Sequence, residues 1–213
     1  MPFLRIASNP TLVMGGHTMC GCGWVNFTGV ANPNQHLLTK TTGAVGTDEY
    51  FLQVNSNTTL RWGISTGAAY QVVNWSAPIT NAVQYFVYFD WDGTNLHINV
   101  NNGTAVALAA AGPINTGTSS LRFGADGADL VDVNAIQDAF ALWKDRVMTP
   151  TEQTLLYNGG SGWRYDTVPA SLLSSLVSWW DFDGKSGGVW TDSFGANDLT
   201  DVNDSVTVVA GVT

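Results

Sequence analysis

Residues 83–100, VQYFVYFDWDGTNLHINV, constrain the fold most strongly, because two runs of strand-type residues flank Asp92-Gly93. Both alternate sets of the first run are apolar, which indicates an inner strand covered on both faces. The second run alternates apolar and polar residues, the pattern of a half-buried strand. Asp-Gly between such runs predicts a hairpin with a type I′ turn, whose two central residues have positive φ. A second hairpin is expected at Asn102-Gly103, so the middle of the chain is predicted to be an antiparallel meander.

The rest of the chain repeats this pattern of short strands separated by Gly, Asn and Pro turns. One helix is expected at 149–157, where Thr149 and Glu152 form a capping box around Pro150 and Asn158 ends the helix. One or two helical turns are expected at 169–175. This composition of elements predicts an all-β fold, a two-sheet antiparallel sandwich or jelly roll. The further strands are predicted at 3–7, 18–27, 36–41, 50–54, 59–64, 70–75, 121–124, 136–143, 176–182 and 206–209.

Charged residues make up 12% of the chain, about half of the usual ~25%, and the net charge is −9. The absence of a basic run argues against nucleic acid and anionic membranes as partners. The sequence contains no stretch of about 20 apolar residues, so membrane insertion is not expected. The first residues, MPFLRIASNP, lack the features of an export signal. A surface-type composition without an export signal favours a virion protein made in the host cytoplasm, with the bacterial extracellular surface as the alternative location.

Cys20 and Cys22 are the chain's two cysteines and lie on the same face of a predicted strand. That arrangement suits a mutual disulfide poorly, so two small buried residues are favoured over a redox or metal pair. Gly21 and Gly23 share the other face, where their missing side chains leave room for a backbone or a large aromatic ring.

The order of these segments resembles the laminin-G-like, concanavalin A-like jelly-roll family, of the kind found in phage structural proteins. TMCGCGWVN at 18–26 is similar to an early strand of the family, and FDWDGTNLHINVNNG at 89–103 is similar to its double hairpin. LRFGAD at 121–126 and DAFALWKDRVMTPTEQTLLY at 138–157 resemble its later strand and its ending. The resemblance covers residues 3–165 and implies a lectin-like jelly roll, in which Trp24 and Trp143 occupy core positions.

The C-terminus departs from this order. LVSWWDFDGKSGGVWTDSFGANDLT at 176–200 resembles the segment that normally opens such a domain. We therefore expect a single domain over 1–213 in which residues 169–213 supply the opening strands. The alternative is a jelly roll over 1–168 followed by a docking tail at 169–213.

Candidate catalytic groups are scarce. The paired carboxylates of the superfamily's glucanases require a motif that this chain lacks, since Glu49 and Glu152 are its two glutamates and stand far apart. We therefore expect no enzyme, and a glycoside hydrolase is the least favoured interpretation. Asp126, Asp129 and Asp132 lie in a Gly-containing loop; a solvated acidic loop is favoured there, and a Ca²⁺ site is the alternative. No cofactor is required.

The nine tryptophans offer candidate contacts for a partner or a glycan. The favoured interpretation is a non-enzymatic virion protein, a phage capsid decoration, fibre or tail-associated subunit that binds capsid or tail proteins and itself as a homo-oligomer. The alternative is a carbohydrate-binding module that recognises host or surface glycans. The candidate contact tryptophans for a partner or a glycan are Trp62, Trp75, Trp163 and Trp190.

Overall fold

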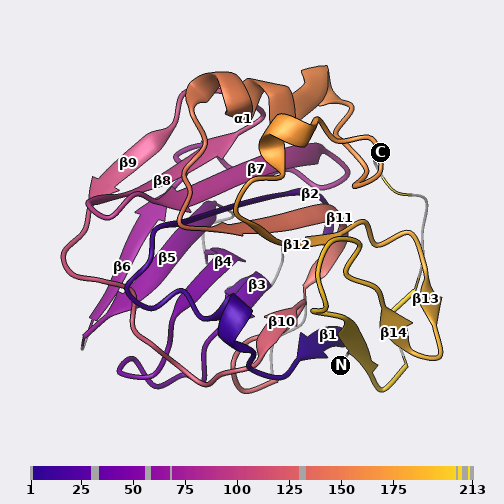
Figure 1. Cartoon of the computed structure of the whole chain (residues 1–213), viewed down its shortest axis with the longest axis horizontal. Helices are drawn as coiled ribbons and strands as arrows, with labels where there is room; N and C mark the ends of the chain where they lie inside the picture. Colours follow the sequence, from indigo (N-terminus) through magenta and orange to yellow (C-terminus); the bar gives the residue numbers. More distant parts are fainter. Residues whose placement is uncertain are drawn as a thin grey trace.

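The computed structural model describes residues 2–29, 34–55, 59–67, 69–129, 133–204, 206–207 and 211. They form two antiparallel sheets packed face to face, which confirms the predicted sandwich (Figure 1). The larger sheet has the order β13 (Lys185–Ser186), β14 (Val189–Trp190), β15 (Leu199–Val202), β1 (Phe3–Ile6), β10 (Leu121–Phe123), β3 (Gln35–Lys40), β4 (Tyr50–Val54), β5 (Leu60–Thr66) and β6 (Ala69–Asn74). The smaller sheet has the order β12 (Leu176–Trp180), β11 (Asn134–Lys144), β2 (Met19–Gly29), β7 (Gln84–Trp91), β8 (Asn95–Val100) and β9 (Val106–Ala109).

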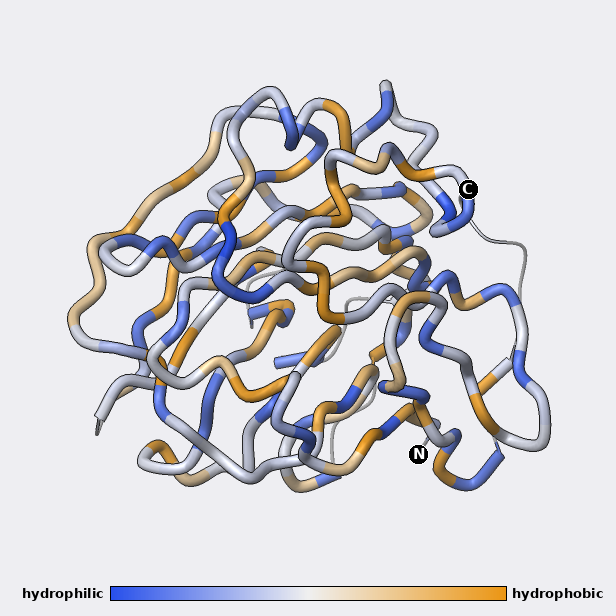
Figure 2. Tube along the Cα trace, in the orientation of Figure 1, coloured by the Kyte–Doolittle hydropathy of each residue, from blue (hydrophilic) through white to orange (hydrophobic). Residues whose placement is uncertain are grey.

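β7 lies inside the smaller sheet and is buried on both faces, as its sequence predicts. One alternate set, which includes Val87 and Phe89, belongs to the core between the sheets. The other set, Phe86 and Tyr88, belongs to a second apolar cluster with Trp24. Leu156 of the helix α1 (Pro150–Tyr157) also belongs to that cluster. The apolar stretches run along the strands through the middle of the molecule (Figure 2).

Gly21 and Gly23 of β2 leave room for aromatic rings from the neighbouring strands β7 and β11 of the same sheet. A Cβ at Gly21 would lie 2.4 Å from the Phe89 ring, and a Cβ at Gly23 would lie 2.4 Å from the Phe140 ring. The expected aromatic neighbours are therefore present. Cys20 and Cys22 face the other way, and both are buried free thiols.

The two hairpin turns differ in detail from the prediction. At Asp92-Gly93 only the glycine has positive φ, and the Asp92 carboxylate accepts from the backbone N–H groups of Thr94 and Asn95 at 2.7 and 2.6 Å. An Asx turn has replaced the type I′ turn, because the aspartate side chain satisfies these donors locally. In the second hairpin Asn101 and Asn102 have φ of 53° and 55°, so the type I′ turn lies one residue earlier than expected.

The helix confirms the capping signals. The Thr149 hydroxyl accepts from the Glu152 N–H while the Glu152 carboxylate accepts from the Thr149 N–H, and Asn158 ends the helix in the left-handed conformation. The segment at 169–175 forms the short turn η3 (Ala170–Leu172). Two more such turns are η1 (Pro10–Leu12) and η2 (Asn158–Gly160). Among the described residues no helix has the length and apolarity to cross a membrane.

The C-terminal segment contributes strands to both sheets. β12 pairs with β11, and β15 pairs with β1. That these strands replace the ones that open related domains stays a prediction. Val206 is not in a strand, and residues 208–209 of the last predicted strand lie outside the described part of the chain.

Candidate functional site

The structure places the four candidate tryptophans in different environments. Trp62 is fully buried, its indole N–H donating to the Asp90 carbonyl at 2.9 Å, and Trp190 is 3% exposed. These two cannot serve as exposed platforms, because their large apolar rings are covered in the core. Trp75 is half-buried, with its ring edge-on to Tyr85, and Trp163 is half-buried, with its N–H bound to the Leu155 carbonyl.

The acidic loop is tied down by its own neighbours. The Asp129 carboxylate contacts Arg122 at 2.5 Å and Arg5 at 3.9 Å, and the Asp126 carboxylate accepts from the Ala128 N–H at 3.0 Å. Asp132 lies outside the described residues. Among the residues that are described, no three His, Cys, Asp or Glu side chains gather as a metal site. Calcium binding by this loop stays a prediction.

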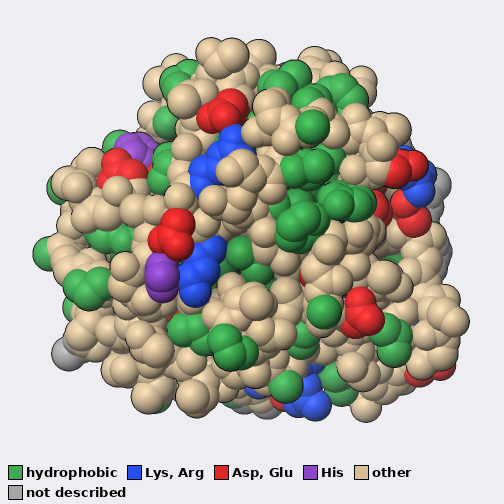
Figure 3. All heavy atoms as spheres, viewed as in Figure 1, with side chains coloured by type: hydrophobic (Ala, Val, Ile, Leu, Met, Phe, Trp, Pro, Cys, Tyr) green, Lys and Arg blue, Asp and Glu red, His purple; other side chains and the backbone are tan. Residues whose placement is uncertain are grey.

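A groove of about 540 Å³ crosses the surface beside β12, and we call it the Phe194 groove. Hydrophobic side chains gather near β12 in the middle of this face, with acidic and basic groups beside them (Figure 3). Phe194 is 41% exposed. The lining residues are Asn9, Pro10, Thr11, Lys144, Leu176, Val177, Phe194, Gly195, Ala196 and Asn197.

Asp192 shapes the loop that carries the aromatic ring. Its carboxylate is buried and accepts from the N–H groups of Trp179, Phe194 and Asn197 at 2.9, 3.1 and 3.1 Å. Gly195 is required by close approach, because a Cβ there would lie 2.6 Å from the Asp192 carboxylate. The loop is therefore built around one buried acceptor rather than around its own turn preference.

Asn197 joins this loop to the N-terminal wall of the groove. Its amide nitrogen donates to the Ser178 hydroxyl at 2.7 Å, which fixes it on β12. Its Oδ1 accepts from the Asn9 amide at 2.8 Å and from the Thr11 hydroxyl at 3.2 Å. Asn9 in turn caps η1 by accepting from the Thr11 N–H. Segments 188 residues apart thus form one continuous polar wall.

The Phe194 ring is held from one side. It packs edge-to-face on Tyr165, with ring centroids 5.9 Å apart and planes at 66°, and the Tyr165 N–H donates to Asp181 at 3.0 Å. At the other end of the groove the Lys144 ammonium, at the end of β11, donates to the Val13 carbonyl at 2.7 Å. The result is an open aromatic surface flanked by amide, hydroxyl and ammonium groups.

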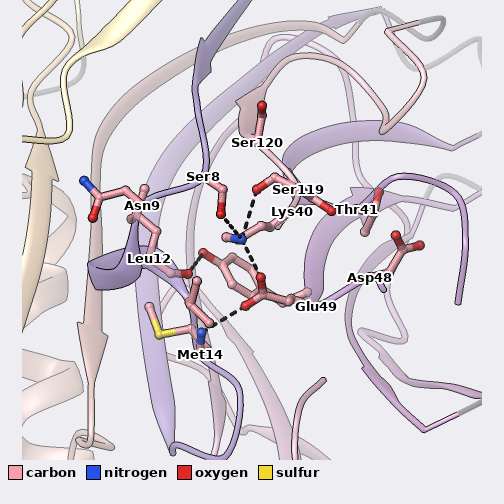
Figure 4. Close-up of polar contacts among 12 residues, drawn as sticks. Ser8, Asn9, Leu12, Met14, Lys40, Thr41, Asp48, Glu49, Ser119 and Ser120 are labelled. Atoms are coloured by element: carbon pink, nitrogen blue, oxygen red, sulfur yellow. Dashed lines mark hydrogen bonds and ion pairs between the residues drawn. The ribbon is translucent and has the colours of Figure 1, made fainter. Parts of the chain in front are cut away.

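A buried ion pair supports the N-terminal wall from beneath (Figure 4). Lys40 and Glu49 form a salt bridge with both side chains 0% exposed. Glu49 also accepts from the Met14 N–H at 3.0 Å, and the neighbouring Tyr50 hydroxyl donates to the Leu12 carbonyl at 3.1 Å. Burial raises the pKa of Glu49, and the Lys40 ammonium opposes that rise. The pair and Tyr50 hold residues 12–14 in place through these hydrogen bonds. Because no solvent reaches the pair, it is closed to a substrate.

The fold agrees with a family match. The family model for the concanavalin A-like lectin/glucanases superfamily matches residues 5–152. The chain belongs to this superfamily. The matched range ends inside α1, so it includes the N-terminal wall of the groove and Lys144 but does not include Phe194.

Solved lectin-like structures share the fold at low identity. A Bacteroides ovatus protein whose proposed role is carbohydrate binding aligns with TM-score 0.70 and 13% identity, over 94% of this chain and 55% of its own. A SAP-like pentraxin from Limulus polyphemus aligns with TM-score 0.53 and 14% identity, over 73% of this chain and 75% of its own. A botulinum neurotoxin type C structure aligns with TM-score 0.53 and 16% identity, over 73% of this chain and 39% of its own. No curated protein matches the chain.

Phe194 is not among the candidates predicted from the sequence, because those are all tryptophans. Phe194 lies in the polar stretch DSFGAND at 192–198, and an aromatic residue inside such a stretch is itself a signal. A large apolar side chain in a turn has few partners to cover it, so it is a better platform candidate than an aromatic residue in a strand.

Proposed function

We propose that this chain is a non-catalytic carbohydrate-binding module and that the Phe194 groove holds the glycan. The observation that carries the proposal is the 41% exposed Phe194 ring, fixed by Tyr165 and bordered by hydrogen-bonding side chains. Binding sites for small ligands combine apolar and aromatic walls with a few placed polar groups in this way.

The groove offers complementary surfaces for a sugar ring. An aromatic face is negatively polarised, so it attracts the weakly positive C–H groups on the flat side of a pyranose. Thr11, Asn9 and Lys144 supply donors and acceptors for the hydroxyl groups at the ring's edge. Lys144 is the one charged side chain among the described lining residues, so the groove suits neutral or acidic sugars.

The structural neighbours support the same class of ligand. Carbohydrate binding is the proposed role of the Bacteroides ovatus protein, and cell entry of botulinum neurotoxin type C depends on interaction with two ganglioside molecules. The chain spans 55% and 39% of those two chains, and their likeness extends to the fold.

The lack of catalysis is part of the proposal. Glu49 is sealed in its pair with Lys40, and Glu152 is engaged by the helix cap and by Arg146 at 2.6 Å. A pair of accessible carboxylates flanking a bound sugar is what glycoside hydrolysis needs. Release of reducing sugar from any polysaccharide on prolonged incubation would contradict this part of the proposal.

A glycan array tests the binding function, with Phe194→Ala as the disabling variant. Covering a Phe194 residue that is 41% exposed buries about 80 Å², taking about 200 Å² for a whole aromatic side chain. At about 25 cal/mol per Å² this is worth about 2 kcal/mol, or about 30-fold in affinity. Leu108→Ala is the matched control, since Leu108 is 39% exposed on β9 and lies outside the groove. Equal binding by both variants would refute the site.

The virion role is a second proposal, supported by the low charged fraction of 12% and by the apolar side chains in Figure 3. Phage decoration, fibre or tail-associated subunits assemble with copies of themselves or with capsid proteins, and either contact would cover such side chains. Sedimentation at micromolar concentration tests it. A stable homo-oligomer supports the proposal, and a monomer that does not bind phage particles counts against it.

A further inference from the structure

A second cavity, of about 220 Å³, lies where β1, β10 and β11 meet the C-terminal segment. It shares no lining residue with the Phe194 groove. The lining residues are Pro2, Phe3, Leu4, Phe123, Gly124, Val133, Ala135, Ile136, Gln137, Asp138, Phe182, Trp190, Val206, Thr207 and Gly211.

Two buried polar atoms of the cavity wall lack hydrogen-bond partners within the described part of the chain. One is the indole N–H donor of Trp190, whose side chain is 97% covered, and the other is the Oε1 acceptor of Gln137. Leaving such a group unsatisfied costs free energy, and native structures satisfy the great majority of them. This donor and this acceptor on one cavity wall match a ligand that both accepts and donates hydrogen bonds.

Aromatic rings form the apolar part of the wall. Phe182 packs edge-on against Phe123 and Trp190, with centroid distances of 5.3 and 6.0 Å. Phe182 and Trp190 also separate the cavity from a smaller hollow of about 160 Å³. The ligand must therefore combine hydrogen-bonding groups with an apolar face.

The backbone around the cavity is strained. Phe182 has a φ of 56°, and Ala139, next to the lining residue Asp138, has a φ of 46°. The pairing of β11 with β2 shifts register between Asp138 and Ala141. Bulges and left-handed bulky residues cost free energy and concentrate where a site needs a re-aimed side chain.

We propose that this cavity binds one uncharged sugar ring or a polyol of similar size. One ligand hydroxyl accepts from the Trp190 indole N–H, another donates to Gln137 Oε1, and the C–H face of the ligand packs on the Phe182 side of the wall. The buried Asp138 carboxylate disfavours ligands that carry their own carboxylate. The site shares no lining residue with the Phe194 groove, and its interpretation as a second place for sugar rests on the carbohydrate-binding function proposed above.

The test is an NMR titration of the full chain with glucose, galactose, N-acetylglucosamine and glycerol, one at a time. The reporter is the Trp190 indole N–H resonance, assigned by its absence in Trp190→Phe. We expect saturable shifts at millimolar concentration with at least one of the four, and about tenfold weaker binding in Gln137→Leu, which removes the acceptor. Trp163→Phe is the matched control, because its indole N–H is already bound to Leu155 outside this cavity.

Persistence of the indole shift in Phe194→Ala would support a separate site, and its loss there would overturn that separation. The proposal fails if none of the four compounds shifts the Trp190 resonance at 100-fold excess. It also fails if Gln137→Leu binds as tightly as the parent chain. Ordered water as the sole occupant in a crystal soaked with the same compounds would likewise refute it, because water can satisfy both atoms.

Discussion

Replacing Glu49 by Gln is predicted to destabilise the protein strongly although it changes few atoms. The side chain keeps its shape and an acceptor for the Met14 N–H. It loses the charge that balances Lys40, whose ammonium is 0% exposed and whose other acceptors are neutral oxygens of Ser119 and Ser8. Removing one partner of a buried ion pair costs about 3–5 kcal/mol, because the remaining charge is left without compensation.

Restoring neutrality should recover most of that loss. Lys40→Met alone is expected to cost a similar amount, and the double variant Lys40→Met/Glu49→Gln should lie within about 2 kcal/mol of the parent, since neutral replacements of buried pairs are often tolerated. At about 2–4 °C per kcal/mol for a chain of this size, each single variant should lower Tm by about 6–20 °C.

Urea denaturation of the four proteins gives this coupling directly as a double-mutant cycle. Strictly additive effects would refute the reasoning, because they would mean that the two charges do not compensate each other. A loss below about 1 kcal/mol in Glu49→Gln would refute it as well, because it would place the pair in an environment where water screens charge.

Three further predictions follow from single residues. Burial lowers the pKa of His36 to about 4 from 6.5, so the unfolded state binds more protons between these two values. Acidification from pH 6.5 to 4 should therefore cost the parent up to ~3 kcal/mol of stability that His36→Phe does not lose. Burial raises the pKa of Asp90 to about 6, which acts in the opposite direction in both proteins, and identical Tm curves against pH would contradict the prediction. Gly195→Ala should cost about 1–3 kcal/mol and weaken glycan binding, because its Cβ would meet the Asp192 carboxylate; unchanged stability and binding would show that the loop can shift freely. Glu152→Ala should lower stability by about 1 kcal/mol through loss of the helix cap, and thermal melting matching the parent would count against it.

The sandwich and its central strand could be predicted because they depend on local pattern. The two apolar sets of β7 face the two apolar clusters in which the structure places them. The capping box of Thr149 and Glu152 likewise depends on four consecutive residues, so it could be predicted from the sequence. The turn type at Asp92-Gly93 could not be predicted from the two residues alone, since an Asp side chain offers the backbone a second way to satisfy its donors.

The polar sequence around Phe194 offers a signal for its exposure, but the walls of the candidate site could not be predicted, because long-range contacts assemble them. Trp62 and Trp190 looked uncommitted in the sequence, yet their large apolar area favours burial. Phe194 is exposed because its loop is fixed by contacts to Asn9 across 188 residues and by a buried Asp192. No local signal reveals such a contact, and the same holds for the pairing of Lys40 with Glu49 across neighbouring strands.

A titration of the isotope-labelled chain with the strongest array glycan, followed at each backbone amide, is the most direct test of glycan binding in the Phe194 groove. We expect saturable shifts at Thr11, Phe194, Gly195 and Asn197, and binding about 30-fold weaker in Phe194→Ala with Leu108→Ala unchanged. Shifts confined to another face of the sandwich, or a Phe194→Ala variant that binds as tightly as the parent, would contradict it.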